Sequence, residues 1–211
     1  MPYITTRTTE QRSVLAMLRA LVPQRPLLPS ETLRLAELQA NRLLEHFAIS
    51  TTAVPEELIT ELPRILMLRE PVPVSGSAYW NGRYWLITVS SDEPRSRQRF
   101  SLMHEFKHVL DHTTKQFLYR DRPFQSAHEQ AERVADYFAA CLLMPKRMVM
   151  RLWCSGHQDI AELAHKLEVS PAAVRYRLHQ LGLTDSPQRC YRPARILRRP
   201  PRRLNPILEV G

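Results

Sequence analysis

Apolar residues recur at a helical period along most of the chain. Between residues 30 and 47 they are spaced three and four apart, and Ser30 stands before them as the expected N-cap of a helix. The same period over residues 97–112 predicts a second long helix. Its apolar stripe consists of Phe100, Met103, Phe106 and Leu110. Shorter helical patterns predict further helices over 8–22, 55–62, 127–144 and 146–154, with a Pro-rich joint at 23–29 and a loop at 113–126.

A strand pattern is confined to the middle of the chain. An extended stretch containing Pro71 and Pro73 leads to aromatic residues on both sides of Asn81-Gly82, which is a strong short signal for a hairpin turn. We expect the second strand of the hairpin to run from Tyr84 to Val89. The predicted fold class is therefore α+β, mostly helical, with one small sheet.

Length and composition set the class of protein. The 211 residues allow one or two domains with a real core, and no apolar run approaches the roughly 18 residues that span a membrane. The N-terminus lacks the apolar region of a secretory signal. None of the three cysteines forms a CxxC pair, so we expect a reducing, cytoplasmic compartment and no disulfide framework. Five Gly against 17 Pro argues against a Gly-rich nucleotide site.

The net charge of +9 first suggests a nucleic-acid partner. However, residues 189–211 hold seven Arg and one Glu, whereas residues 1–188 hold 23 basic and 20 acidic residues. Most of the excess therefore belongs to an Arg/Pro-rich tail at 186–211, which we expect to be disordered or draped over the surface. This tail is one candidate for contact with DNA.

Residues 104–108, His-Glu-Phe-Lys-His, carry the chemistry. Residues four apart share one face of a helix, so His104 and His108 can bind one Zn²⁺, with Mn²⁺ as the alternative ion. Glu105 lies beside them and can act as general base on a water that the metal activates. This HExxH pattern predicts a zinc-type metallo-endopeptidase.

Such a site needs a third protein ligand. The metzincin continuation is excluded because Asp111 and Thr114 stand where Gly and His are required. His112, Glu129 and Glu132 remain as candidates. Glu132 is favoured because a Glu from a second helix completes a His₂Glu catalytic set. Asp136 follows on the same face as Glu132 and could accept the free ring N–H of a ligand histidine.

Other groups are candidates by position alone. His128, Tyr119 and Tyr137 could stabilise an oxyanion or act as an acid. The strand at 84–89 leads into the metal helix, and we expect it to be the edge strand that pairs with the substrate backbone.

The two helices together resemble the ImmA/IrrE family of metallopeptidases. The matching stretches are 97–108 and 132–145, supported by Val74-Ser75-Gly76-Ser77-Ala78 and by the Leu-Gly-Leu at 181–183. The resemblance covers roughly residues 36–185. It implies a gluzincin-like fold in which His104, His108 and Glu132 bind the metal and Glu105 is catalytic. It also implies a helix-turn-helix repressor as protein substrate, cleaved to derepress mobile-element or stress genes. Lys107 departs from the small Gly that is common there, which predicts a flexible cation beside the site.

The segment at 159–181 looks like a DNA-binding bihelix. Ser170 and Pro171 suit the start of its second helix, whereas Glu168 occupies the turn position where Gly is usual. If that helix entered a major groove, Arg175 and Tyr176 could touch DNA. The alternative is that the bihelix only packs beside the peptidase core.

The expected organisation has four parts. They are an N-terminal helical extension (1–35), a gluzincin-like metallopeptidase domain (36–157), a helix-turn-helix-like segment (158–185) and the Arg/Pro-rich tail (186–211). Two other functions stay open beside the peptidase. One is a DNA-binding transcriptional regulator with a structural or vestigial metal site, and the other is a toxin–antitoxin component.

Overall fold

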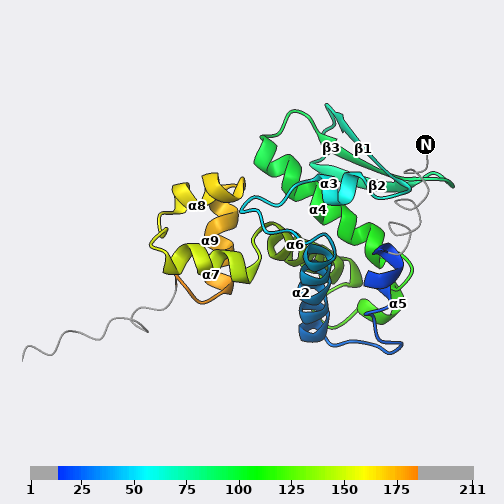
Figure 1. The fold of residues 1–211 in the computed structure, drawn as a ribbon. Coiled ribbons are helices and arrows are strands. Elements are labelled where there is room, and N and C mark those ends of the chain that lie inside the picture. Colours follow the sequence, from blue (N-terminus) through cyan, green and yellow to red (C-terminus); the bar gives the residue numbers. More distant parts are fainter. Residues whose placement is uncertain (1–13, 185–211) are drawn as a thin grey trace, which may run out of the picture.

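The computed structural model describes residues 14–184 (Figure 1). A helical segment at 14–19 precedes the other elements. In chain order these are α2 (Pro29–His46), α3 (Glu57–Thr60), β1 (Ile65–Glu70), β2 (Gly76–Trp80), β3 (Trp85–Ser90), α4 (Arg95–Asp111), α5 (Lys115–Leu118), α6 (Ala127–Leu143), α7 (Lys146–Cys154), α8 (Ile160–Leu167) and α9 (Pro171–Gln180). The predicted α+β class, mostly helical with one small sheet, is confirmed.

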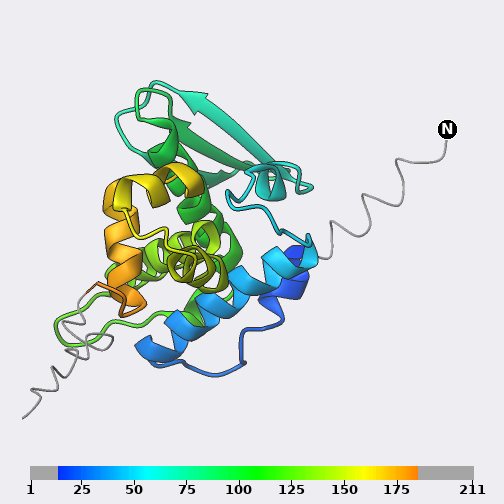
Figure 2. The ribbon, with the colours of Figure 1, turned by 60° about the vertical axis from the view of Figure 1, so that its left-hand side comes forward.

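The sheet has three strands in the order β1-β3-β2. β1 runs parallel to β3, and β2 runs antiparallel to it. The hairpin forms where Asn81-Gly82 predicted it: the Asn81 side chain accepts hydrogen bonds from the backbone N–H groups of Arg83 and Tyr84, and Gly82 has φ +92°. The sheet covers one side of α4, and α6 and α2 lie on the other side (Figure 2).

One expectation about the strands was wrong, and one strand was not predicted. Residues 65–70 form strand β1, because they pair with β3 some twenty residues later in the chain. The strand expected at 84–89 is β3, and it is the central strand with a neighbour on each side. β2 is the edge strand that lies against α4.

Local capping explains where several helices begin. α2 starts at Pro29 rather than after Ser30, because Glu31 reaches back to accept a hydrogen bond from the Leu28 backbone N–H at 2.8 Å. The expected Ser30 cap was therefore wrong. Ser126 caps α6, and Ser170 caps α9 by accepting from the backbone N–H of Ala173. A short helix, α5, lies within the loop expected at 113–126.

The buried core includes the described N-terminal residues. Leu18 and Leu43 are fully buried in the same cluster as Phe106. Arg19 donates to the backbone carbonyls of Val109 and Leu110 in the last turn of α4, where carbonyl groups run short of partners within the helix. α2 runs across the boundary expected at residue 35. The N-terminal segment thus helps to hold the metal helix.

Lys107 corrects the sequence prediction of a flexible cation beside the site. Its side chain is 1% exposed and points away from the histidines, into the core beneath α4. The ammonium donates to the Asp111 carboxylate at 2.6 Å and to the Gln39 side-chain oxygen at 2.7 Å. Adjacent helical residues differ by about 100° around the axis, which is why Lys107 and His108 face different surroundings.

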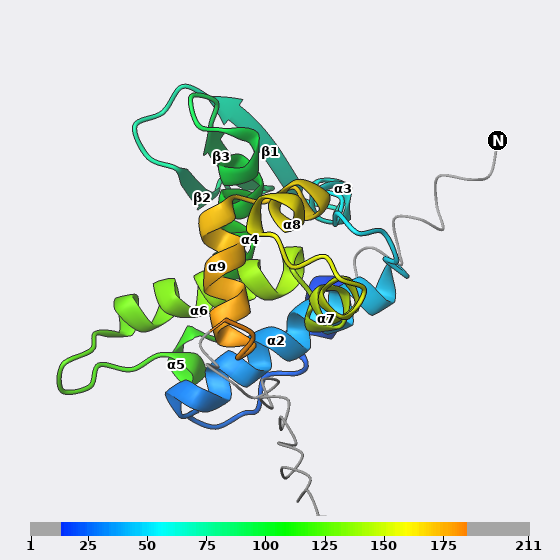
Figure 3. The ribbon, with the colours of Figure 1, turned by 90° about the vertical axis from the view of Figure 1, so that its left-hand side faces the viewer.

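α8 and α9 form the predicted bihelix, which lies beside α4 and α6 (Figure 3). Glu168 makes the turn in the left-handed region, at φ 52° and ψ 45°. Its carboxylate pairs at 2.8 Å with Arg99, a buried residue of α4. A non-glycine residue thus takes a conformation that costs roughly 1–2 kcal/mol, and the ion pair ties the turn to the metal helix.

Two expected features lie outside the described residues: the first part of the helix at 8–22, and the Arg/Pro-rich tail at 186–211. Within residues 14–184, none of the helices combines the length and the apolar character that crossing a bilayer requires.

Candidate metal centre

The candidate centre lies where α4 and α6 pack together. Three alanines at a helical spacing give α6 a smooth buried face: Ala131, Ala135 and Ala139. Beneath them the Phe106 and Phe138 rings pack with centroids 6.2 Å apart. Small side chains allow close helix packing, so Glu132 of α6 reaches the histidines of α4.

Three ligand-type side chains converge at this point. The Nε2 atoms of His104 and His108 are 3.0 Å apart. Each lies 3.2 Å from an oxygen of Glu132. Metal bonds of 2.0–2.1 Å in a tetrahedron separate neighbouring ligand atoms by about 3.3 Å, so the three groups fit one such ion. Among residues 14–184 this is the set of His, Cys, Asp and Glu side chains close enough to hold a metal.

Asp136 orients the first histidine. Its Oδ1 lies 2.8 Å from His104 Nδ1, which leaves Nε2 of that ring free for a metal. Burial by itself would lower the pKa of His104, but the hydrogen bond and charge of Asp136, with the charges of Glu105 and Glu132, raise it overall. The carboxylate therefore fixes the ring and makes it more basic.

Glu105 lies next to the ligands but forms no part of the triad of close contacts. It is half-buried, and burial raises its pKa above the ordinary value; the charge of His104 opposes this change and that of Glu132 adds to it. Gly76 of β2 packs directly over it: a Cβ atom there would lie 3.0 Å from Glu105 Cγ and 3.2 Å from its Oε1. A carboxylate at this position, open to the cleft beside the two histidines, can accept a proton from a water molecule there.

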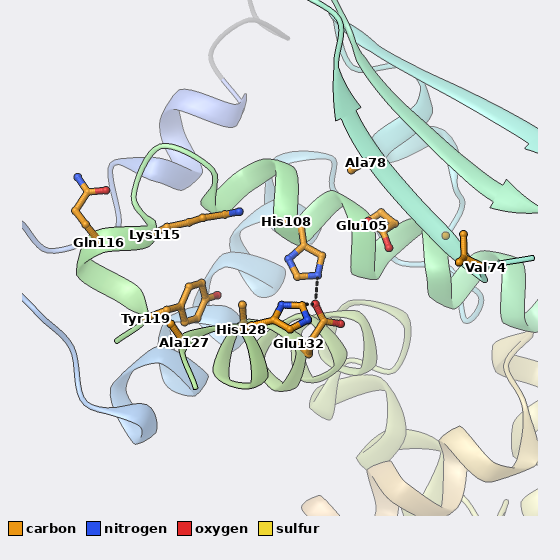
Figure 4. A pocket seen from close by; sticks show the side chains of 12 residues that line it. Val74, Ala78, Glu105, His108, Lys115, Gln116, Tyr119, Ala127, His128 and Glu132 are labelled. Atoms are coloured by element: carbon orange, nitrogen blue, oxygen red, sulfur yellow. Dashed lines mark ion pairs between the residues drawn. The ribbon is translucent and has the colours of Figure 1, made fainter. Parts of the chain in front are cut away.

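A cleft opens in front of these residues (Figure 4). Its main cavity measures about 970 Å³ and is lined by β2, α4, α5 and the start of α6. A smaller cavity of about 300 Å³ continues past His104 and Asp136. The two share Gly76, Glu105 and Glu132, so one continuous cleft crosses the centre.

Two oxyanion candidates line this cleft. Tyr119 is buried, and its hydroxyl donates to Asp111, which occupies its only proton. His128 stands at the rim with its side chain 82% exposed and Nδ1 3.7 Å from Glu132 Oε1. Of these two side chains, His128 is therefore the one with a hydrogen-bond donor available to a ligand in the cleft.

Three other candidates are not brought to the centre. Tyr137 points toward α2 and donates to Glu37 at 3.2 Å. Glu129 accepts the N-cap hydrogen bonds of Ser126. The His112 ring lies edge-on to Trp85, 4.9 Å between centroids. The geometry thus favours Glu132 among the third ligands considered.

The candidate DNA contacts lie elsewhere. Arg175 and Tyr176 are exposed on α9, and Tyr176 lines a third cavity, between α9, α4 and α6.

Sequence reasoning assigned no role to Gly76 or Lys115. Gly76 lies within the Val-Ser-Gly-Ser-Ala stretch that resembled the family, but its contact with Glu105 depends on how β2 packs on α4. The Lys115 side chain extends along the cleft toward His108 (Figure 4). Nothing in the sequence around Lys115 predicts that its side chain extends along the cleft.

Comparisons with known proteins bear on the family and the fold of the chain. Residues 65–179, more than half of the chain, match the family model Peptidase_M78, IrrE N-terminal-like domain. A solved structure titled Mycobacterium tuberculosis transcriptional regulator is similar in fold, with a TM-score of 0.52 at 18% sequence identity. The alignment covers 68% of this chain and 55% of that one, so the chain spans about half the length of that protein. No curated protein matches the sequence.

Proposed function

Because the chain belongs to the IrrE N-terminal-like peptidase family, we propose that it is a zinc-dependent endopeptidase of the cytoplasm. One observation carries this proposal: His104, His108 and Glu132 converge with the spacing of a tetrahedral metal site, and Glu105 stands beside them. A structural zinc site has four protein ligands and needs no base, whereas a catalytic one has three and an open position.

The roles follow from the positions. When bound, the metal supplies a Lewis acid for the scissile carbonyl and a water of lowered pKa. Glu105 takes a proton from the attacking water and can deliver it to the leaving amine. Asp136 holds His104 in the tautomer that presents Nε2. His128, at the rim, is placed to donate to the developing oxyanion.

β2 is suited to hold the substrate backbone. Ser75 and Asn81 bond to β3, so the alternation of an antiparallel ladder turns the N–H and C=O groups of Gly76 and Ala78 outward. These two residues also line the cleft. An extended peptide can therefore add to this edge and pass in front of Glu105.

A helix-turn-helix repressor is the proposed substrate, on the strength of the ImmA/IrrE resemblance. Cleavage would release genes of mobile elements or stress responses from repression. The DNA-binding alternative has one observation in its favour, the bihelix with Arg175 and Tyr176 exposed. No observation on the described residues specifically favours the toxin–antitoxin alternative.

The experiment uses the full chain loaded with zinc and a small helix-turn-helix repressor encoded beside it. We expect specific cleavage fragments by mass spectrometry, abolished by a chelator and restored by added zinc. Glu105→Gln should retain the metal but lose about 10²–10⁴-fold in rate, since a general base is removed. Glu45→Gln, an exposed residue of α2, is the matched control.

Wild-type cleavage rates in metal-loaded Glu105→Gln would contradict the proposal. Salt-sensitive, sequence-specific duplex binding by a protein that cleaves no repressor would favour the DNA-binding regulator instead.

A further inference from the structure

A third cavity, about 370 Å³, lies between α4, α6 and α9. Its lining is mainly apolar at the base, where Ala140 is buried and Phe100 is half-buried. We call it the α9 groove, and its principal residues are Phe100, Asp136, Ala140, Ala172, Ala173 and Tyr176.

The α9 groove is continuous with the metal centre. Arg97, Phe100 and Asp136 line both this groove and the small cavity that contains His104 and Glu105. Asp136 is itself hydrogen-bonded to His104. A peptide lying in the cleft across Glu105 therefore passes the mouth of the groove.

The wall that α9 contributes is held in place. At its start, Ser170 caps the helix, and the preceding Glu168 pairs with Arg99 of α4. Further along, Arg177 is 1% exposed and donates to the backbone carbonyl of Met144 at 3.0 Å. The backbone of this wall is therefore fixed before a ligand binds, which suits a pocket that selects among ligands.

The same arrangement bears on the DNA alternative. In a helix-turn-helix, the first turns of the second helix meet the base edges. Figure 3 shows α9 beside α4 and α6. In this bihelix Ala172, Ala173 and Tyr176 lie in the first two turns of α9 and line the groove. Their chemistry is a pair of methyl groups and an aromatic ring, which fits an apolar side chain better than a phosphate backbone.

We propose that the α9 groove is a specificity subsite of the peptidase, which accepts a large apolar side chain close to the scissile bond of the substrate. The proposal rests on the proposed peptidase function. Phe100, Ala140 and Tyr176 supply the apolar contacts. Arg97, whose guanidinium lies 5.7 Å from the Phe100 ring centroid, stands at the junction with the metal centre.

The test profiles cleavage of a mixed peptide library by the zinc-loaded full chain, read by mass spectrometry. The wild type should prefer Leu, Met, Phe or Tyr at one position near the cut. Ala172→Phe, which fills the groove, should reduce kcat/KM for those peptides about 10–100-fold relative to peptides with Ala at that position. Tyr176→Ala should weaken the same preference, and Tyr176→Phe should keep it.

Ala161→Phe is the matched control, because it places the same side chain on an exposed position of α8 outside the groove. Thermal unfolding by circular dichroism verifies that each variant is folded. An unchanged positional preference in folded, active Ala172→Phe and Tyr176→Ala would overturn the subsite while leaving the peptidase function standing. If the wild type cleaved none of the peptides, both the subsite and the peptidase function would be overturned.

Discussion

The two faces of α4 have opposite chemistry, although the residues that form them are neighbours in the sequence. On the outward face, His104, Glu105 and His108 are partly exposed and line a cleft. On the inward face, Lys107 and Asp111 are 1% and 2% exposed and pair with each other. Two turns of α4 thus supply both the candidate centre and its support.

The inward face joins three elements. Lys107 donates to Gln39 of α2, and Gln39 donates in turn to the Leu18 carbonyl. Asp111 accepts from Tyr119, just after α5. Burial lowers the pKa of Lys107, while the charge and hydrogen bond of Asp111 oppose that change. The difference between the faces is that solvent and ligands reach one, whereas the other is satisfied only by protein groups.

The largest effect is expected on the inward face. Lys107→Ala removes one partner of a buried ion pair and leaves Asp111 uncompensated, so unfolding should become easier by about 3–5 kcal/mol. Denaturant unfolding monitored by circular dichroism measures this change. Glu105→Gln, two residues away on the outward face, is the control and should shift stability by less than about 1 kcal/mol. Equal free energies of unfolding in the two variants would contradict the proposed difference between the inward and outward faces of α4.

Next comes the support of the metal ligands. Asp136→Asn should lower zinc affinity about 10–100-fold, because His104 loses the carboxylate that orients its ring. Competition with a chromophoric chelator measures the affinity. The fold should hold, since the Asp136 side chain is 54% exposed. Undiminished affinity would show that packing alone orients His104.

A smaller effect is expected where β2 meets the outward face. In Gly76→Ala the new methyl group crowds Glu105, and displacing the proposed general base by a fraction of an ångström should reduce kcat roughly tenfold. Zinc affinity should stay unchanged, because the ligands are not touched. Ser77→Ala, whose side chain is exposed on the same strand, is the matched control. A wild-type kcat in Gly76→Ala would mean that Glu105 has room to move.

The smallest expected effect is on the rates at which the thiols of Cys141 and Cys154 react. Burial raises the pKa of Cys141 to about 11, so at pH 8 it stays protonated and unreactive, whereas Cys154 is exposed. Peptide mapping after iodoacetamide treatment should find Cys154 modified first. Cys141 should react faster in Lys107→Ala, as its labelling requires opening of the core. Rapid labelling of Cys141 in the wild type would indicate that the core around α6 is loosely packed.

Motif spacing predicted the outward face well. His104, Glu105 and His108 fall on one side of α4 in any regular helix, and Glu132 with Asp136 on one side of α6, because both pairs are four residues apart. The capping residues Ser126 and Ser170 and the turn at Asn81-Gly82 also follow from local chemistry. Each of these features depends on contacts within a few residues.

Apart from the local error at the Ser30 cap, two errors and one overlooked contact share a physical cause. The place of β3 in the centre of the sheet depends on pairing with β1, some twenty residues earlier. The burial of Lys107 depends on Gln39 and Asp111 meeting under α4, and the contact of Gly76 with Glu105 depends on the sheet packing on that helix. The sequence by itself therefore determined the helices, the hairpin and the ligand types. Only the tertiary structure decided which strand borders the cleft, which cation enters the core and which face of α9 looks toward the centre, because these result from contacts between segments that no local period encodes.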